Sequence, residues 1–150
     1  MENIFKADTT QKLISRINGL TPDSKAKWGL MTVSQMLAHC SVTYELVYDN
    51  KHAKPNFFLK LFLKIFVKNA VTSEKAYKES LQTAPYFMVV DDRDFEKEKN
   101  RLVAFLNKTC EHGESFFNGK ESHSFGALNS TEWNNMFYKH LDHHLKQFGV

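Results

Sequence analysis

The strongest constraint on this fold is the recurrence of apolar residues at helical spacing behind recognisable helix-capping residues. Thr32 with Gln35, and Asn129 with Glu132, have the spacing of a capping box, in which two side chains satisfy the free amide groups of a helix start. The chain has only 3 Pro and 6 Gly in 150 residues, which favours long helices over a sheet with many turns. The sequence therefore predicts an all-α fold.

Four long helices can be placed from these signals. We expect them to cover residues 8–18, 32–49, 91–110 and 129–148, with Asp91 or Asp92 capping the third. Residues 110–128 are rich in Gly, Glu, Ser and Asn and predict a loop. Residues 70–90 look irregular apart from a short extended piece at 86–90. The sequence therefore predicts one helical-bundle domain over residues 1–150.

Charge and cysteine content exclude several classes of protein. The net charge of +3 is too small to indicate a nucleic-acid partner. Cys40 and Cys110 form no disulfide framework and suit a reducing compartment. The first residues, MENIFKADTTQ, lack the basic and then apolar pattern of a signal peptide. We therefore expect a cytoplasmic location and a small-molecule substrate rather than a nucleic acid.

Residues 56–69 are apolar apart from Asn56, Asn69 and three lysines, Lys60, Lys64 and Lys68. The apolar stretch is shorter than the about 20 residues that span a bilayer. The lysines recur every four residues and share one helical face, which favours a core or subunit-contact helix with one solvated stripe. A membrane-surface helix has a similar pattern, but the signal is weak. We expect no membrane partner, and a homodimer through this segment stays open.

Two histidines of the last predicted helix lie on its apolar face. His140 and His144 are four residues apart, which places their Cβ atoms about 5–6 Å from each other on a helix. Buried imidazoles cost free energy unless their ring nitrogens find partners. A divalent transition metal such as Zn, Ni or Fe would satisfy both rings. Two core histidines bonded to backbone carbonyls are the alternative. The same face carries Trp133, Met136, Phe137 and Gln147.

A third ligand must come from another helix. His39 is the best candidate, at the edge of the apolar stripe of the second helix. Cys40 lies nearer the centre of that stripe and is a rival ligand, although we expect it to be a small buried hydrophobe. Candidate pocket walls, for which plain core packing is the alternative, are Trp28, Tyr44 and Trp133.

These motifs resemble a known group of proteins. TVSQMLAHC, followed far downstream by a helix with HxxxH, resembles the DinB/YfiT-like superfamily of four-helix-bundle metalloenzymes. Trp28, Thr83-Ala84-Pro85, HSFGALNSTEW and YKHLDHHLKQFG are similar to the uncharacterised DUF1569 family within that group. The resemblance implies an up-down-down-up four-helix bundle with a short extra helix or irregular insert. It also implies His39, His140 and His144 as metal ligands.

Three imidazole ligands leave coordination positions open, so a metal there can lower the pKa of a bound water or thiol. Superfamily members of known activity include thiol-dependent S-transferases and isomerases. The resemblance therefore implies S-transferase-like chemistry on a small electrophile, with a low-molecular-weight thiol as second substrate. A metal-dependent hydrolase and a non-enzymatic metal- or ligand-binding bundle are the alternatives. No carboxylate is expected as general base, because Asp142 is predicted to face outward and Glu45 to face away from the core. Lys139 is also predicted to face outward.

Overall fold

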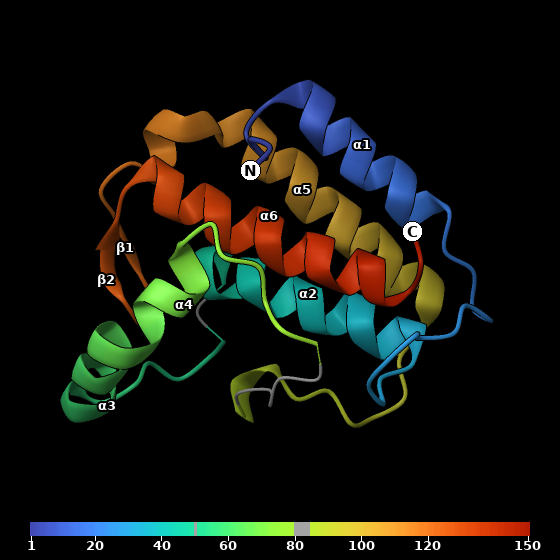
Figure 1. Cartoon of the computed structure of the whole chain (residues 1–150), viewed down its shortest axis with the longest axis horizontal. Helices are drawn as coiled ribbons and strands as arrows, with labels where there is room; N and C mark the ends of the chain where they lie inside the picture. Colours follow the sequence, from blue (N-terminus) through green and yellow to red (C-terminus); the bar gives the residue numbers. More distant parts are fainter. Residues whose placement is uncertain (50, 80–84) are drawn as a thin grey trace.

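The structure is a computed structural model that describes residues 1–49, 51–79 and 85–150, and the described chain is mostly helical (Figure 1). The longer helices are α1 (Ala7–Asn18), α2 (Val33–Tyr48), α5 (Phe95–Phe117) and α6 (Ser130–Gln147). Two short helices, α3 (Phe57–Phe62) and α4 (Lys68–Thr72), are joined by a π-helical turn at Leu63–Val67. Strands β1 (Lys120–Ser122) and β2 (Gly126–Leu128) pair antiparallel. The prediction of an all-α fold therefore missed this small two-stranded sheet.

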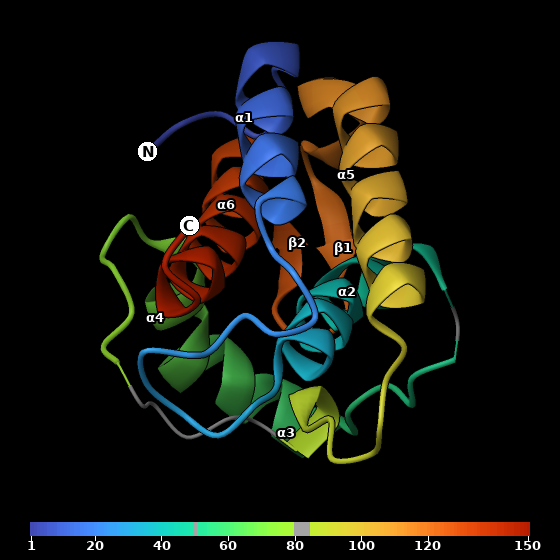
Figure 2. The same cartoon turned by 90° about the vertical axis from the view of Figure 1, so that its right-hand side faces the viewer.

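The four longer helices enclose the apolar core. Helix α2 packs against α5 and α6, and α1 packs against the same two helices from the other side (Figures 1 and 2). Helices α1 and α6 run in one direction, while α2 and α5 run in the other (Figure 1). The interior is built from large side chains that are almost wholly buried, among them Leu13, Ile17, Leu37, Tyr44, Leu102, Leu106, Phe117, Trp133, Phe137 and Leu145.

The predicted helix starts are largely confirmed. Both capping boxes are present, at Thr32 for α2 and at Asn129 for α6. The cap of α5 is Asp94, whose side chain accepts a hydrogen bond from the Lys97 amide, and not Asp91 or Asp92. Asp91 instead bonds the Arg93 side chain, so a charged partner occupies the carboxylate that the sequence offered as a cap.

The loop predicted over 110–128 is wrong for most of its length. Helical structure continues to Phe117 across a break at Gly113, whose φ of 67° lies in the left-handed region that glycine adopts readily. Phe117 is fully buried and stacks on Phe5 at 5.0 Å between ring centroids. The hairpin follows directly. The polar composition of this segment did not indicate the last turn of α5, because a single buried aromatic ring, that of Phe117, anchors that turn.

The core role predicted for residues 56–69 is also wrong. In α3 and the π turn no residue is buried, and Lys60 and Lys68 form ion pairs with the protein body. Lys60 pairs with Glu121 of β1 at 3.4 Å, and Lys68 pairs with Glu132 of α6 at 2.8 Å. Most of the apolar side chains, among them Phe57, Phe58 and Phe66, are left exposed on the outer side. No helix in the described part of the chain is long and apolar enough to cross a membrane.

Helix α4 is held to α6 by side chains of α6 that donate hydrogen bonds to the carbonyl groups at the end of α4. The Lys139 ammonium donates to the carbonyls of Ala70 and Ser73, and the Asn135 amide donates to that of Thr72 at 2.9 Å. Carbonyls at a helix end lack partners within the helix, so such donors fix the end in place. Lys139 is buried, contrary to the prediction that it faces outward, and burial lowers its pKa to about 8.

The extended piece predicted at residues 86–90, within the irregular region 70–90, also needs a correction. Pro85–Phe87 forms a short 3-10 turn in place of the extended piece that was expected to begin at 86. The Thr83-Ala84 part of the family-like patch lies outside the described residues, while Pro85 opens the turn. The carbonyl of Phe87 meets a histidine of α2, so this turn is positioned by the site described below.

Glu45 lies in a buried ionic cluster between α2 and α5, not on the open side of α2. Its side chain contacts Lys51, His52 and Arg101. Burial alone would raise the pKa of Glu45, but hydrogen bonds from Lys51 and His52 and the charge of Arg101 outweigh it, so the pKa is lowered from 4.5. The contribution of this carboxylate to stability is therefore full above pH 4.5 and is lost as the pH falls through its lowered folded-state pKa.

Glu45→Gln is expected to reduce the acid sensitivity of the fold. At neutral pH the variant should be less stable by about 1–3 kcal/mol, because charge-assisted hydrogen bonds to a carboxylate are lost. Below pH 4.5 the difference from wild type should shrink, because the Glu45 carboxylate of wild type then takes up a proton when the chain unfolds. Urea unfolding at both pH values measures this, with exposed Glu111→Gln as control. An equal difference at the two pH values would contradict the assignment.

Candidate metal centre

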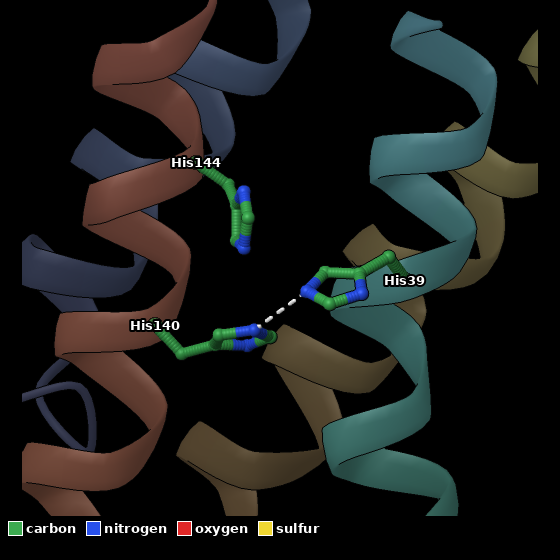
Figure 3. Close-up of side chains that lie close together, drawn as sticks. All are labelled: His39, His140 and His144. Atoms are coloured by element: carbon green, nitrogen blue, oxygen red, sulfur yellow. Dashed lines mark hydrogen bonds between the residues drawn. The ribbon is translucent and has the colours of Figure 1, made fainter. Parts of the chain in front are cut away.

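Three histidine rings from two helices meet at one point in the structure (Figure 3). His39 comes from α2, and His140 and His144 come from successive turns of α6. One ring nitrogen from each lies within 4.8 Å of the others. The Nε2 atoms of His39 and His140 are 2.9 Å apart. The three residues predicted as ligands are thus brought together, and metal binding itself stays a prediction.

The opposite nitrogen of each ring has an oxygen partner. Nδ1 of His39 lies 2.8 Å from the Phe87 carbonyl, and Nδ1 of His140 lies 3.0 Å from the Thr43 hydroxyl. Nδ1 of His144 lies 2.8 Å from the amide oxygen of Gln147. Carbonyl and amide oxygens only accept hydrogen bonds, so His39 and His144 carry their proton on Nδ1. The Nε2 lone pairs of these rings therefore face the common centre.

The orientation of the Gln147 amide is itself fixed. Its nitrogen donates to the backbone carbonyl of Trp28 at 2.6 Å, so its oxygen must be the atom that faces His144. Hydrogen bonds behind ligand rings hold the tautomer and the ring direction in many metal sites. Here the supporting groups come from four segments: the loop before α2 (Trp28), α2 itself (Thr43), the 3-10 turn (Phe87) and α6 (Gln147).

The electrostatics of the cluster disfavour protonated rings. Burial lowers the pKa of His39, and it lowers the pKa of His144 to about 3. Burial, together with the charges of the neighbouring histidines, holds the pKa of His140 well below its ordinary value. With Nδ1 of His39 protonated, a proton on Nε2 of His140 makes the 2.9 Å hydrogen bond to Nε2 of His39, and a bound metal ion would replace that proton. This donor set fits a divalent transition metal, whose binding requires unprotonated imidazole.

A cavity of about 360 Å³ lies beside the histidines, large enough for a small organic molecule. Helix α2, helix α4, the hairpin and α6 form its sides, and the three histidines form part of its lining. Among the described residues that line it there is no Asp or Glu. The walls are mostly apolar, with side chains such as Leu46, Val47, Val67, Val71, Phe125 and Met136.

The predicted pocket walls have different places in the structure. Trp133 lines the cavity and also packs in the core. Tyr44 is a core residue stacked on Phe137 at 4.9 Å and does not line the cavity. Trp28 contacts the His143 ring at 5.8 Å and contributes its backbone carbonyl to Gln147. The alternative reading of plain core packing therefore holds for Tyr44.

The rival ligand Cys40 is not part of the cluster. It is fully buried, and its sulfur contacts that of Met36 at 3.7 Å. Burial raises the pKa of the Cys40 thiol, which keeps it protonated. Cys40 therefore packs as a small hydrophobe, as expected from the sequence.

Several residues of the site were missed by the sequence analysis. Helical spacing places Gln147 on the face of His140 and His144, and Thr43 one turn after His39, but neither residue was predicted to take part in the site. Phe87 and Tyr77 come from segments without a periodic pattern, and nothing in the sequence pointed to them. His143, the neighbour of His144 in the sequence, also lines the cavity.

Thr43→Val is expected to weaken metal binding by about 10–100-fold, the usual effect of removing a partner behind a ligand ring. The substitution keeps the size of the side chain but leaves Nδ1 of His140 without its hydroxyl. Competition with a chromophoric chelator measures the affinity. Ser41→Ala is the matched control, because this buried hydroxyl on the same helix donates to the Leu37 carbonyl and not to a histidine of the cluster. Equal affinities for wild type and Thr43→Val would refute the role of Thr43.

Comparison with known proteins gives a family without an assigned activity. Residues 5–149 match the family described as "Protein of unknown function (DUF1569)". No curated protein and no solved structure matches the chain. The match covers nearly the whole chain, including both histidine motifs. The chain belongs to the DUF1569 family.

Proposed function

We propose that this protein is a metal-dependent enzyme with S-transferase-like activity, which joins a low-molecular-weight thiol to a small electrophile. His39, His140 and His144 would hold one divalent transition metal, Zn, Ni or Fe. When bound, such a metal supplies Lewis acidity that lowers the pKa of a coordinated thiol, and the thiolate is the reactive form. The observation that carries the proposal is the convergence of three ring nitrogens beside an apolar cavity.

The protein's own groups would orient the rings and shelter the reaction. The Phe87 carbonyl, the Thr43 hydroxyl and the Gln147 amide direct the three imidazoles. The apolar walls would bind the carbon skeleton of the electrophile and exclude water, which strengthens electrostatic interactions at the site. The reaction forms one sulfur–carbon bond, breaks the bond from that carbon to its leaving group, and releases the thiol proton to solvent.

The cavity favours a transferase over a hydrolase. A metal-dependent hydrolase commonly uses a carboxylate as general base for its water, and none lines the cavity among the described residues. Asp142, the acidic residue between the two α6 histidines, is bound to Arg16 and Lys146 instead. A thiol with a lowered pKa ionises without such a base, so a site that lacks a carboxylate suits thiol chemistry.

We further propose that the helices form the up-down-down-up bundle of the DinB/YfiT-like superfamily, as one domain. The directions of α1, α2, α5 and α6 support this assignment, because the first and last run opposite to the middle two (Figure 1). The α3–α4 segment would then be the insert between the second and third helices of the bundle.

Metal-loaded protein is expected to accelerate the conjugation of low-molecular-weight thiols to a panel of small electrophiles, with consumption of free thiol as the readout. His39→Ala should reduce the rate to that of metal in buffer. His112→Ala is the matched control, because this histidine lies on α5 against Phe116, away from the cluster. Tight metal binding with no rate above buffer across the panel would sink the enzyme proposal and leave a metal-binding bundle.

A further inference from the structure

The outer face of α3 and the π turn exposes an unusual amount of apolar surface. Its two most exposed side chains, Phe57 and Phe58, are 74% and 80% exposed, and Phe66 is 68% exposed. Exposed apolar patches of this kind mark sites of contact with a protein or a membrane. We call this surface the Phe face; it comprises Phe57, Phe58, Leu61, Phe62, Ile65 and Phe66, which lie two by two at four-residue intervals.

The outward direction of the Phe face is fixed by the rest of the protein. Its lysine side is tied to the protein body by the pairs Lys60–Glu121 and Lys68–Glu132, and α4 is anchored to α6 by Lys139. The sequence FFLKLFLKIFVK repeats three apolar residues and a lysine three times. A four-residue repeat drifts around a helix of 3.6 residues per turn, and one wider π turn reduces this drift. The apolar residues thus stay on one outer side.

The local charge decides between the possible occupants of this face. Residues 51–73 contain five lysines and no Asp or Glu. Lys51, Lys60 and Lys68 pair with acidic residues of the protein body, whereas Lys54 and Lys64 are exposed and form no ion pair with the described residues. In a two-fold homodimer the same patch would meet itself, and Lys54 and Lys64 of the two copies would be brought together. An anionic bilayer instead attracts basic residues beside an amphipathic helix while its acyl region accepts the apolar side chains. Charge complementarity therefore favours a membrane surface over a second copy.

We propose that the α3–α4 segment is an interfacial helix that docks the protein on an anionic bilayer through the Phe face. The sequence favoured a core or subunit-contact role for these residues, and for that reason no membrane partner was expected. Their exposure excludes the core role. The Phe face enters the headgroup region, and Lys54 and Lys64 approach the lipid phosphates. The opposite side of the same segment contributes Val67, Ala70 and Val71 to the cavity wall.

Vesicle sedimentation with the full chain tests this docking. Wild type should sediment with vesicles of equimolar phosphatidylcholine and phosphatidylglycerol and bind pure phosphatidylcholine much more weakly. The double variant Phe58→Ser/Phe66→Ser should bind the anionic vesicles at least about tenfold more weakly, since each ring loses its apolar burial. Leu30→Ser is the matched control, because Leu30 is fully exposed in a loop outside the segment. Its binding should equal that of wild type.

A lysine variant separates charge from apolar insertion. Lys54→Gln/Lys64→Gln should reduce binding to anionic vesicles by about fivefold per lysine and leave the weak binding to pure phosphatidylcholine unchanged. Light scattering without lipid reports the oligomeric state. No sedimentation with either vesicle, equal binding of wild type to both, or a lipid-free dimer that Phe58→Ser/Phe66→Ser dissociates would each overturn the proposal. Circular dichroism confirms that every variant is folded.

Discussion

His140→Ala is expected to abolish stoichiometric metal binding, with a loss of affinity of at least about 100-fold. His140 lies close to both other rings of the cluster, because its Nε2 lies 2.9 Å from that of His39 and its ring centroid lies 4.8 Å from that of His144. Removing a ligand should cost more than removing a hydrogen bond behind a ligand, for which about 10–100-fold is usual. Two imidazoles from different helices would remain.

Metal titration by calorimetry and thermal unfolding with and without metal measure this effect. Metal that binds only the folded chain stabilises it, by about 2.7 kcal/mol when the metal is at 100 times its dissociation constant. Wild type should therefore gain thermal stability on loading, and His140→Ala should gain none. His112→Ala, a substitution of the same kind on α5, should behave as wild type. Undiminished affinity in His140→Ala would show that the metal is held elsewhere.

Phe137→Ala is expected to lower the free energy of unfolding by about 3–5 kcal/mol, the usual cost of removing a buried aromatic ring. The Phe137 ring stacks on Tyr44 at 4.9 Å and an interplanar angle of 4°. It also contacts Trp133 and Phe117 at centroid distances of 5.4 Å. These contacts join α6 to α2 and α5, so the same cluster that fills the core holds the two histidine-bearing helices together.

Urea unfolding of the metal-free protein isolates the packing contribution. Phe57→Ala is the matched control: the same substitution on a side chain that is 74% exposed should change stability by no more than about 0.5 kcal/mol. Similar losses for Phe137→Ala and Phe57→Ala would contradict the assignment of the core. Because Phe137 lies one turn before His140, we also expect weaker metal binding in the folded fraction of Phe137→Ala.

Local chemistry allowed the helices and the histidine cluster to be predicted from the sequence. The capping residues Thr32 and Asn129 act within one turn, so they could be found without knowing the fold. The His140–His144 pair follows from helical spacing alone. Periodicity left His39 at the edge of its stripe, and the family resemblance supplied the expectation that it joins the pair.

The errors arise where residues far apart in sequence decide the environment. Lys139 was expected in solvent, but the end of α4 covers it and supplies carbonyls as partners. Glu45 was expected to be exposed, but Lys51, His52 and Arg101 enclose it. Periodicity shows that two sides of a helix differ, but it does not show which side faces the protein.

The same limit explains the reversed orientation of the α3–α4 segment. The sequence correctly indicates a lysine side and an apolar side, and the usual rule places the apolar side in the core. Glu121 and Glu132, more than 50 residues downstream, instead attract the lysines toward the hairpin and α6. No pattern within residues 56–69 contains that information.

X-ray absorption spectroscopy of the zinc-loaded protein tests the central claim most directly. Three imidazole nitrogens at about 2.0–2.1 Å from the metal are predicted, together with oxygen donors from solvent and no sulfur. The spectrum of His140→Ala should lose this imidazole signature. A sulfur scatterer at about 2.3 Å, or zinc that shows no imidazole neighbours, would contradict the assignment of His39, His140 and His144 as the metal centre.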